Sequence, residues 1–151
     1  MIECRELSKF YRANTALEVR AAVDVSFTVK GGEVFALLGA NGAGKTSTLR
    51  TMATILSPTS GDCLIDGVSI IENGEQARRR MGYLSGETRL YERLTPLEVI
   101  KYFGEFFDVP QDTVAERRET LIATLGMVEY ANTPCGELST GRKQMVSIAR
   151  A

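Results

Sequence analysis

The chain has 151 residues, of which 44% are hydrophobic and 25% charged, and its formal net charge is −1. This length and composition are typical of one soluble globular domain or part of one, and the nearly neutral charge excludes a general attraction to nucleic acid or anionic lipid. No apolar run reaches the roughly 18 residues of a membrane-spanning helix. The N-terminus, MIECRELSKFYR, lacks the apolar segment of a signal peptide.

The cysteine spacing and the absence of histidine limit the kinds of metal binding and catalysis expected of this chain. Cys4, Cys63 and Cys135 are widely spaced and match neither a metal-binding nor a disulfide pattern, so we expect free thiols in a reducing, cytoplasmic compartment. The sequence contains no histidine, which removes histidine acid–base catalysis. We interpret Glu75, Glu87 and Glu92 as surface acids and assign none of them a catalytic role.

The first third of the chain has the pattern of strands. Apolar and polar residues alternate over 23–29, which predicts a half-buried strand. Gly31 and Gly32 then predict a hairpin turn. The continuous apolar run VFALL at 34–38 predicts a strand that is covered on both faces.

A helix is predicted after this run, with Leu49, Met52, Ala53 and Leu56 on one face and its end before Pro58. Alternation over 61–70 predicts a short hairpin. A polar helical stretch follows and ends in the three arginines 78–80, which we interpret as a solvated helix end. MGYLS at 81–85 then predicts another strand.

From Thr95 the pattern becomes helical. Thr95-Pro-Leu-Glu98 predicts a capping box, and Leu97, Ile100, Phe103 and Phe107 recur at helical spacing. A second helix is predicted over about 112–125 with Gly126 as its C-cap, and a third near the end of the sequence. We expect Phe103, Phe106 and Phe107 to lie in the core of this helical region. Strands followed by helices predict an α/β core with a helical insertion.

The string GANGAGKT at 39–46 matches the phosphate-loop pattern G-x-x-x-x-G-K-[ST] and lies between a predicted strand and a predicted helix. Glycines allow backbone N–H groups to surround a phosphate, and the helix N-terminus adds a favourable dipole. Lys45 is expected to bridge the β- and γ-phosphates, and the Thr46 hydroxyl to bind Mg²⁺. The loop alone does not separate kinases, GTPases and transport ATPases.

A second motif separates these classes. LSTGRKQ at 138–144 resembles the signature of ATP-binding cassette (ABC) ATPases, usually written LSGGQ. FYRA, LIDG at 64–67 and LYERLTP at 90–96 also resemble family segments. The STG variant and LYERLT are most similar to the ATPases of ABC-2-type exporters, the group that includes sodium exporters. The resemblance covers almost the whole chain.

The resemblance implies an α/β P-loop NTPase fold and a set of binding residues. Its parts are a β-rich region with the phosphate-loop core over about 1–90, a helical subdomain over about 91–137 and a signature helix over 138–151, with an incomplete core sheet. ATP and Mg²⁺ are the implied cofactors. The residues implied to contact ATP are Tyr11, Gly39, Ala40, Asn41, Gly42, Ala43, Gly44, Lys45, Thr46 and Ser47, with Tyr11 stacking on adenine.

The family resemblance implies two partners. The residues Leu138, Ser139, Thr140, Gly141, Arg142, Lys143 and Gln144 would face the ATP of a second ATP-binding subunit in a head-to-tail dimer. The helical subdomain and the loop near 86–95 would contact a membrane permease, which places the chain on the cytoplasmic face of the membrane. Arg142 and Lys143 are equally consistent with a solvated helix face.

The sequence departs from the family at three places. The family's Gln after MGYLS is replaced by Gly86, with Glu87 and Thr88 next, and Thr140 replaces a Gly. The strand that ends in Asp-Glu and the later His are absent, so we identify no catalytic residue. The missing segments lead us to expect that the chain is either a fragment of a longer ATPase or a naturally short relative that does not hydrolyse ATP. A nucleotide-binding module without hydrolysis and a non-transport ABC ATPase remain alternatives, and the transported substrate is not encoded here.

Overall fold

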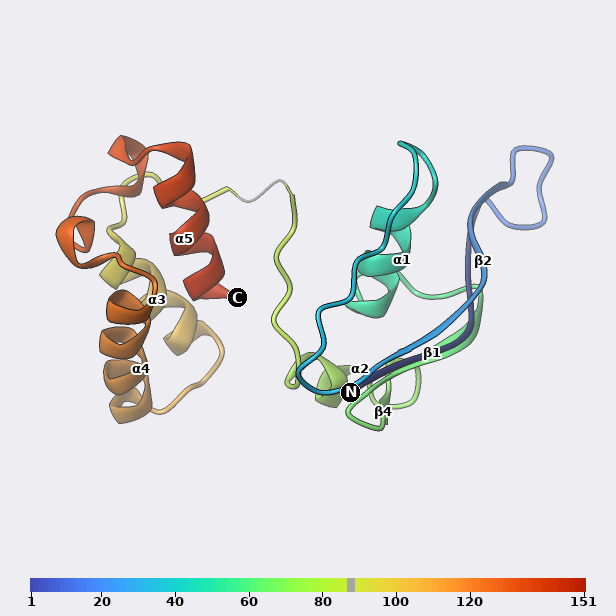
Figure 1. Cartoon of the computed structure of the whole chain (residues 1–151), viewed down its shortest axis with the longest axis horizontal. Coiled ribbons are helices and arrows are strands. Elements are labelled where there is room, and N and C mark those ends of the chain that lie inside the picture. The colour runs from blue at the N-terminus through green and yellow to red at the C-terminus, as the bar shows by residue number, and fades with distance from the viewer. Residues whose placement is uncertain (87–88) are drawn as a thin grey trace. The chain divides into compact units, whose positions relative to one another are not determined.

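The structure is a computed structural model that describes residues 1–86 and 89–151. It divides into two compact units, Met1–Gly82 and Tyr83–Ala151, which we describe separately (Figure 1). Among the described residues, no helix combines the length and the apolar character needed to cross a membrane.

Unit 1 contains an antiparallel sheet in the order β2-β1-β3-β4. The strands are β1 (Ile2–Tyr11), β2 (Val19–Val29), β3 (Ser60–Ile65) and β4 (Val68–Ser69). The predicted hairpin over 61–70 is confirmed: Asp66 and Gly67 join β3 to β4 with φ values of 47° and 77°. Positive φ at both central residues is what the tightest antiparallel hairpins require.

The alternation predicted over 23–29 is only partly right, because β1 and β2 pair irregularly. The register shifts near Asp24, whose φ is 48°, and near Glu6, whose φ is also 48°. At each of these positions one strand carries an extra residue, which forms a β-bulge. Beyond a bulge, the side chains that faced one side of the sheet face the other. Ala22 is therefore buried, whereas Val23 is 51% exposed and does not join the alternating apolar face.

The predicted buried strand at 34–38 is wrong for this structure. Gly31 and Gly32 do form a turn, closed by the Glu33 N–H donating to the Lys30 carbonyl at 3.3 Å, but the segment after it pairs with none of the described strands. Val34 and Leu38 are exposed. A strand of this kind needs parallel neighbours on both sides, and the described sheet offers only antiparallel ones.

The predicted strand at 81–85 is likewise absent from the described strands. The helices of unit 1 are α1 (Lys45–Met52) and α2 (Gly74–Arg78). As predicted, α1 ends before Pro58, and Met52 and Ala53 are buried, but Leu49 is 46% exposed. The core of unit 1 consists of Cys4, Leu7, Met52, Cys63, Ile65, Ile70 and Ala77.

Unit 2 is helical, with α3 (Pro96–Phe106), α4 (Gln111–Thr124), the short 3-10 turns η1 (Val128–Tyr130) and η2 (Cys135–Glu137), and α5 (Thr140–Arg150). The capping box is confirmed, because the Glu98 N–H donates to Thr95 Oγ1 at 3.3 Å and the Thr95 N–H donates to Glu98 Oε2 at 2.8 Å. Gly126, with φ 64°, lies just after α4 as predicted. The core consists of Val99, Ile100, Ile122, Met127, Tyr130, Ala131, Cys135, Leu138 and Val146.

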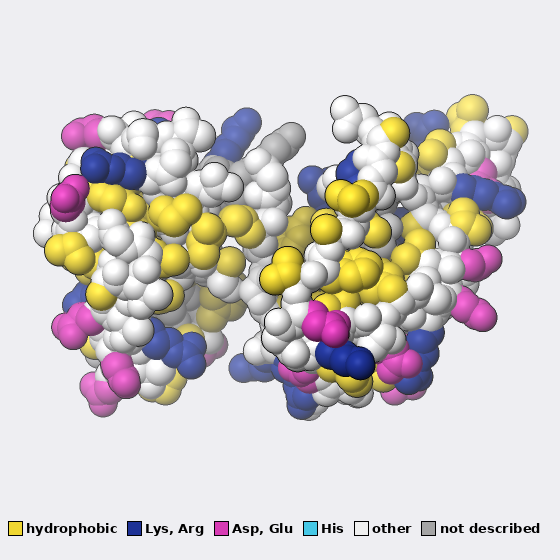
Figure 2. Space-filling model, viewed as in Figure 1, with side chains coloured by type: hydrophobic (Ala, Val, Ile, Leu, Met, Phe, Trp, Pro, Cys, Tyr) yellow, Lys and Arg dark blue, Asp and Glu magenta, His cyan; other side chains and the backbone are white. Residues whose placement is uncertain are grey.

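The expectation that three phenylalanines lie in this core holds only for Phe103, which packs against it partly buried. Phe106 and Phe107 are 65% and 63% exposed. They occupy the last turn of α3 and its C-cap, and their rings contact each other edge to face at 5.2 Å. Figure 2 shows apolar side chains reaching the surface on this face of each unit.

The capping box provides a direct test of unit 2. Thr95→Ala should lower the free energy of unfolding by about 1 kcal/mol, because the Glu98 N–H loses its acceptor at the start of α3. Urea unfolding monitored by circular dichroism measures the change. Thr95→Ser keeps a hydroxyl and should remain within about 0.5 kcal/mol of the wild type; an equal loss in both variants would contradict the role of the cap.

Candidate functional site

The loop at 39–46 leads directly into α1, and its shape depends on two glycines. Gly42 and Gly44 have φ values of 85° and 86°, a region that other residues rarely adopt. Gly44 is the N-cap of α1, and a Cβ atom there would lie 1.6 Å from the carbonyl oxygen of Ala21 in β2. Only glycine therefore allows the loop to pass this close to the sheet.

The first turn of α1 presents free backbone donors. Its first intrahelical bond is from the Thr48 N–H to the Gly44 carbonyl, at 2.8 Å. The N–H groups of Lys45, Thr46 and Ser47 precede that bond, as the first donors of a helix always do. The first turn carries no acidic side chain, so nothing there offsets the positive end of the helix dipole. This arrangement suits an anion.

Lys45 folds back over the loop. Its Nζ donates hydrogen bonds to the carbonyl oxygens of Gly39 at 2.6 Å and Ala40 at 2.7 Å. The ammonium group is thus held above the same turn that the free N–H groups border. An anionic ligand would offer it stronger, charge-assisted partners than these neutral carbonyls.

Tyr11 lies at the end of β1 and reaches α1. Its hydroxyl is 3.0 Å from Ser47 Oγ, and its ring is 37% exposed. Lys9 Nζ lies 5.4 Å from the ring centroid and donates to the Ser57 carbonyl at 2.8 Å. Sequence reasoning missed Lys9, because it predicted no strand over 2–11, and only a strand brings residues two apart to one face.

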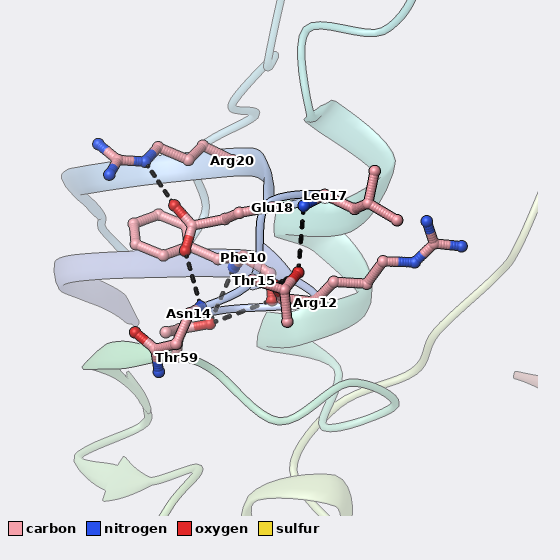
Figure 3. Close-up of polar contacts among 8 residues, drawn as sticks. All are labelled: Phe10, Arg12, Asn14, Thr15, Leu17, Glu18, Arg20 and Thr59. Atoms are coloured by element: carbon pink, nitrogen blue, oxygen red, sulfur yellow. Dashed lines mark hydrogen bonds and ion pairs between the residues drawn. The ribbon is translucent and has the colours of Figure 1, made fainter.

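Polar contacts fix the segment between β1 and β2 that follows Tyr11 (Figure 3). Glu18 accepts from the Asn14 N–H at 3.0 Å and from Arg20 Nε at 2.9 Å. The Arg20 hydrogen bond, followed by the Asn14 N–H, lowers the pKa of the Glu18 carboxyl. On the other side of β1, the Phe10 N–H donates to Thr59 Oγ1 at 2.8 Å. The strand end is therefore restrained from both sides.

The second candidate element is the N-terminus of α5 in unit 2. Leu138 is buried, whereas Ser139, Thr140 and Gly141 are exposed. Ser139 caps the helix, since its Oγ accepts from the Arg142 N–H at 3.4 Å. A Cβ atom at Gly141 would meet nothing within 4 Å, so the helix entrance is open.

Both basic residues of the motif contact their own unit. Arg142 lies 3.6 Å from the Glu129 carboxylate and 4.6 Å from the Tyr130 ring centroid. Lys143 Nζ donates to the Gly136 carbonyl at 3.1 Å. Gln144 is exposed. Both cations thus lie in the first turn of α5, where Arg142 is exposed and Lys143 is half-buried.

The structure brings Tyr11 to the loop within unit 1, and it places all of residues 138–144 in unit 2. Gly86, at the position of the family's Gln, is exposed and has nothing within 4 Å of an added Cβ. Glu87 and Thr88 lie outside the described residues.

Comparison with known proteins now assigns the family. The model of the ABC transporter family matches residues 22–151. The chain is 41% identical to the ABC transporter ATP-binding protein NatA of Bacillus subtilis, over 88% of this chain and 54% of that protein. It is 36% identical to the methionine import ATP-binding protein MetN of Symbiobacterium thermophilum, over 100% of this chain and 46% of that protein. The chain therefore belongs to the ABC transporter family, and it spans about half the length of these relatives.

Solved structures agree on the fold. An ATP-binding subunit of an ABC transporter matches with a TM-score of 0.82 and 28% identity, over 100% of this chain and 61% of that one. A dimeric ATP-binding cassette in a post-hydrolysis state, bound to ADP and Pi, matches with a TM-score of 0.78 and 25% identity, over 99% and 68%. The P-loop NTPase fold predicted from the sequence is confirmed.

The close approach of Gly44 to β2 can be tested without a ligand. Gly44→Ala should lower the free energy of unfolding by about 2 kcal/mol or more, because it adds a steric conflict with Ala21 to an unfavourable positive φ. Urea unfolding measures the loss. Gly31→Ala, where an added Cβ meets nothing within 4 Å, should change it by less than about 0.5 kcal/mol; equal effects would contradict the packing argument.

Proposed function

We propose that this chain is the ATP-binding part of an ABC exporter and binds MgATP through residues 39–47 together with Tyr11. The observation that carries the proposal is the combination at the start of α1: free N–H groups, an uncompensated dipole and the Lys45 ammonium border one turn of backbone. Family membership supports a nucleotide as the anion.

Each residue then has a role. The backbone of 39–44 and the first N–H groups of α1 hold the β-phosphate. Lys45 leaves the carbonyls of Gly39 and Ala40 and bridges the β- and γ-phosphates. The Thr46 hydroxyl, which is exposed at the start of the helix, is a ligand of Mg²⁺. Tyr11 stacks on adenine, and its hydroxyl bond to Ser47 keeps the ring beside the loop.

We propose that residues 138–144 contact the ATP held by a second ATP-binding subunit. The open entrance of α5, without an acidic residue in its first turn, supports contact with a phosphate. Ser139 and Gly141 are the residues at this entrance, and Arg142 and Lys143 add positive charge beside it. The dimeric state of the matched cassette supports the association of two such subunits, for which we propose a head-to-tail arrangement.

The remaining assignments follow the family. We propose that 1–90 is the β-rich region with the phosphate-loop core, 91–137 the helical subdomain and 138–151 the signature helix. A separate membrane permease is the proposed partner, with the chain peripheral on the cytoplasmic face. Export is proposed from the resemblance of LSTG and LYERLT to ABC-2 ATPases. We assign no residue of the sequence to activation of the attacking water.

Lys45→Ala tests nucleotide binding. The affinity for MgATP should fall by about 10- to 100-fold, because charge-assisted hydrogen bonds to the phosphates are lost. Titration calorimetry or a fluorescent ATP analogue measures it. Lys30→Ala removes the same charge from an exposed position of unit 1 and should leave affinity unchanged. Unchanged affinity in Lys45→Ala would reject the loop as the site.

Ser139→Arg tests the second role. In a full-length cassette the variant should bind ATP normally but lose ATP-dependent dimerisation, because a long side chain blocks the entrance of α5. Size-exclusion chromatography with light scattering, with and without ATP, measures it. Glu119→Arg places the same residue at an exposed position of α4 and should dimerise normally. Normal dimerisation of Ser139→Arg would remove residues 138–144 from the interface.

A further inference from the structure

Two of the three cysteines, which sequence spacing left unpaired, lie in contact. Cys4 on β1 and Cys63 on β3 are direct partners in the antiparallel register, and their Sγ atoms are 3.2 Å apart. They are 59 positions apart in the sequence, so no local spacing pattern reveals the pair. Both are free thiols.

The backbone around the pair is held on both sides. Ile2 pairs with Ile65 before it and Arg5 pairs with Asp62 after it. The thiols need a further approach of only about 1 Å to reach bonding distance. Because the register already places the two residues opposite each other, joining them requires no change in strand pairing.

The surroundings of the pair are apolar. Cys4 is 3% exposed and Cys63 is fully buried, and both belong to the core of unit 1. Their mutual hydrogen bond lowers the pKa of Cys4, and the same contact, with burial, raises the pKa of Cys63. Of the two residues only Cys4 retains any exposed surface, so a small oxidant reaches it first. Cys135 lies in the core of unit 2, where burial raises its pKa.

We propose that Cys4 and Cys63 are a redox-responsive pair, which a small hydroperoxide converts into a cross-strand disulfide that joins β1 to β3. The thiolate of Cys4 attacks one peroxide oxygen, the O–O bond breaks, and the leaving oxygen takes a proton and departs as water or alcohol. Cys4 is then a sulfenic acid. The Cys63 sulfur attacks the Cys4 sulfur, the S–O bond breaks, and the released hydroxide takes the thiol proton as a second water. Each sulfur loses one electron and the peroxide gains two.

The bond would act on the part of the chain that contains the proposed ATP site. Residues 5–62 would lie in a covalently closed loop that includes the phosphate loop and α1. Closing such a loop restricts the unfolded chain more than the folded one. Oxidation should therefore stabilise unit 1, and a thiol reductant should reverse the effect. Because both sulfurs are buried, the reaction waits for local opening of the sheet and should be slow.

The test is a disulfide map of the full chain. The reduced protein is treated with hydrogen peroxide, denatured, alkylated and digested with trypsin without a reductant. We expect a linked species of peptides 1–5 and 51–78 that is two hydrogens lighter than their sum, while peptide 119–142 carries an alkylated Cys135. The thermal midpoint should rise on the order of 10 °C and fall again with dithiothreitol.

Matched variants complete the test. Cys135→Ser should form the linked peptide as the wild type does, and Cys63→Ser should form none and show no rise in thermal midpoint. If Cys63→Ser fails to fold, the disulfide map of the wild-type protein still shows whether Cys4 and Cys63 become linked. Three alkylated cysteines after peroxide treatment, a sulfinic acid on Cys4 or a dimer linked through Cys135 would each overturn the proposal.

Discussion

The central position of β1 is the constraint on which unit 1 depends. The strand pairs with β2 on one side and β3 on the other, and Leu7 at its middle is fully buried. Its bulge at Glu6 is matched by the bulge at Asp24, where Ser8 Oγ donates to the Asp24 carboxylate at 3.1 Å and accepts from the Asp24 N–H at 2.9 Å. Both Tyr11 and Cys4 lie on this strand, so the proposed adenine contact and the thiol pair depend on the same element.

The two helix entrances proposed to contact phosphate are built differently. At α1 a left-handed glycine lets the backbone curve and leaves several N–H groups free, while a lysine covers the turn. At α5 a serine side chain already accepts from one N–H group, and the open space at Gly141 allows close approach. The first arrangement could surround an anion, whereas the second leaves open space for one to approach. This difference suits one element that holds a nucleotide and another that only touches it.

Short-range features were predictable from the sequence, and features that need distant partners were not. The capping box at Thr95 and the hairpin over 61–70 each depend on a few neighbouring residues. The run at 34–38 reads as a buried strand because its composition reflects a sheet with parallel neighbours, which the described strands do not supply. The bulge at Asp24 reverses an alternation that looked regular in sequence. The contact between Tyr11 and Ser47 depends on tertiary placement, and only the family resemblance suggested that the two segments act together.

The two hydrogen bonds that Lys45 donates to its own loop affect which ligands can bind at this loop. A ligand that reaches the loop must separate the ammonium from the Gly39 and Ala40 carbonyls, and that separation costs free energy unless the ligand replaces both contacts. A nucleoside has no anionic group to offer in exchange, whereas a phosphate group has several oxygens that can accept from the N–H groups and from Lys45. A di- or triphosphate has oxygens for both. If the proposed nucleotide site is correct, this resting position of Lys45 favours ligands that carry phosphate over a bare nucleoside.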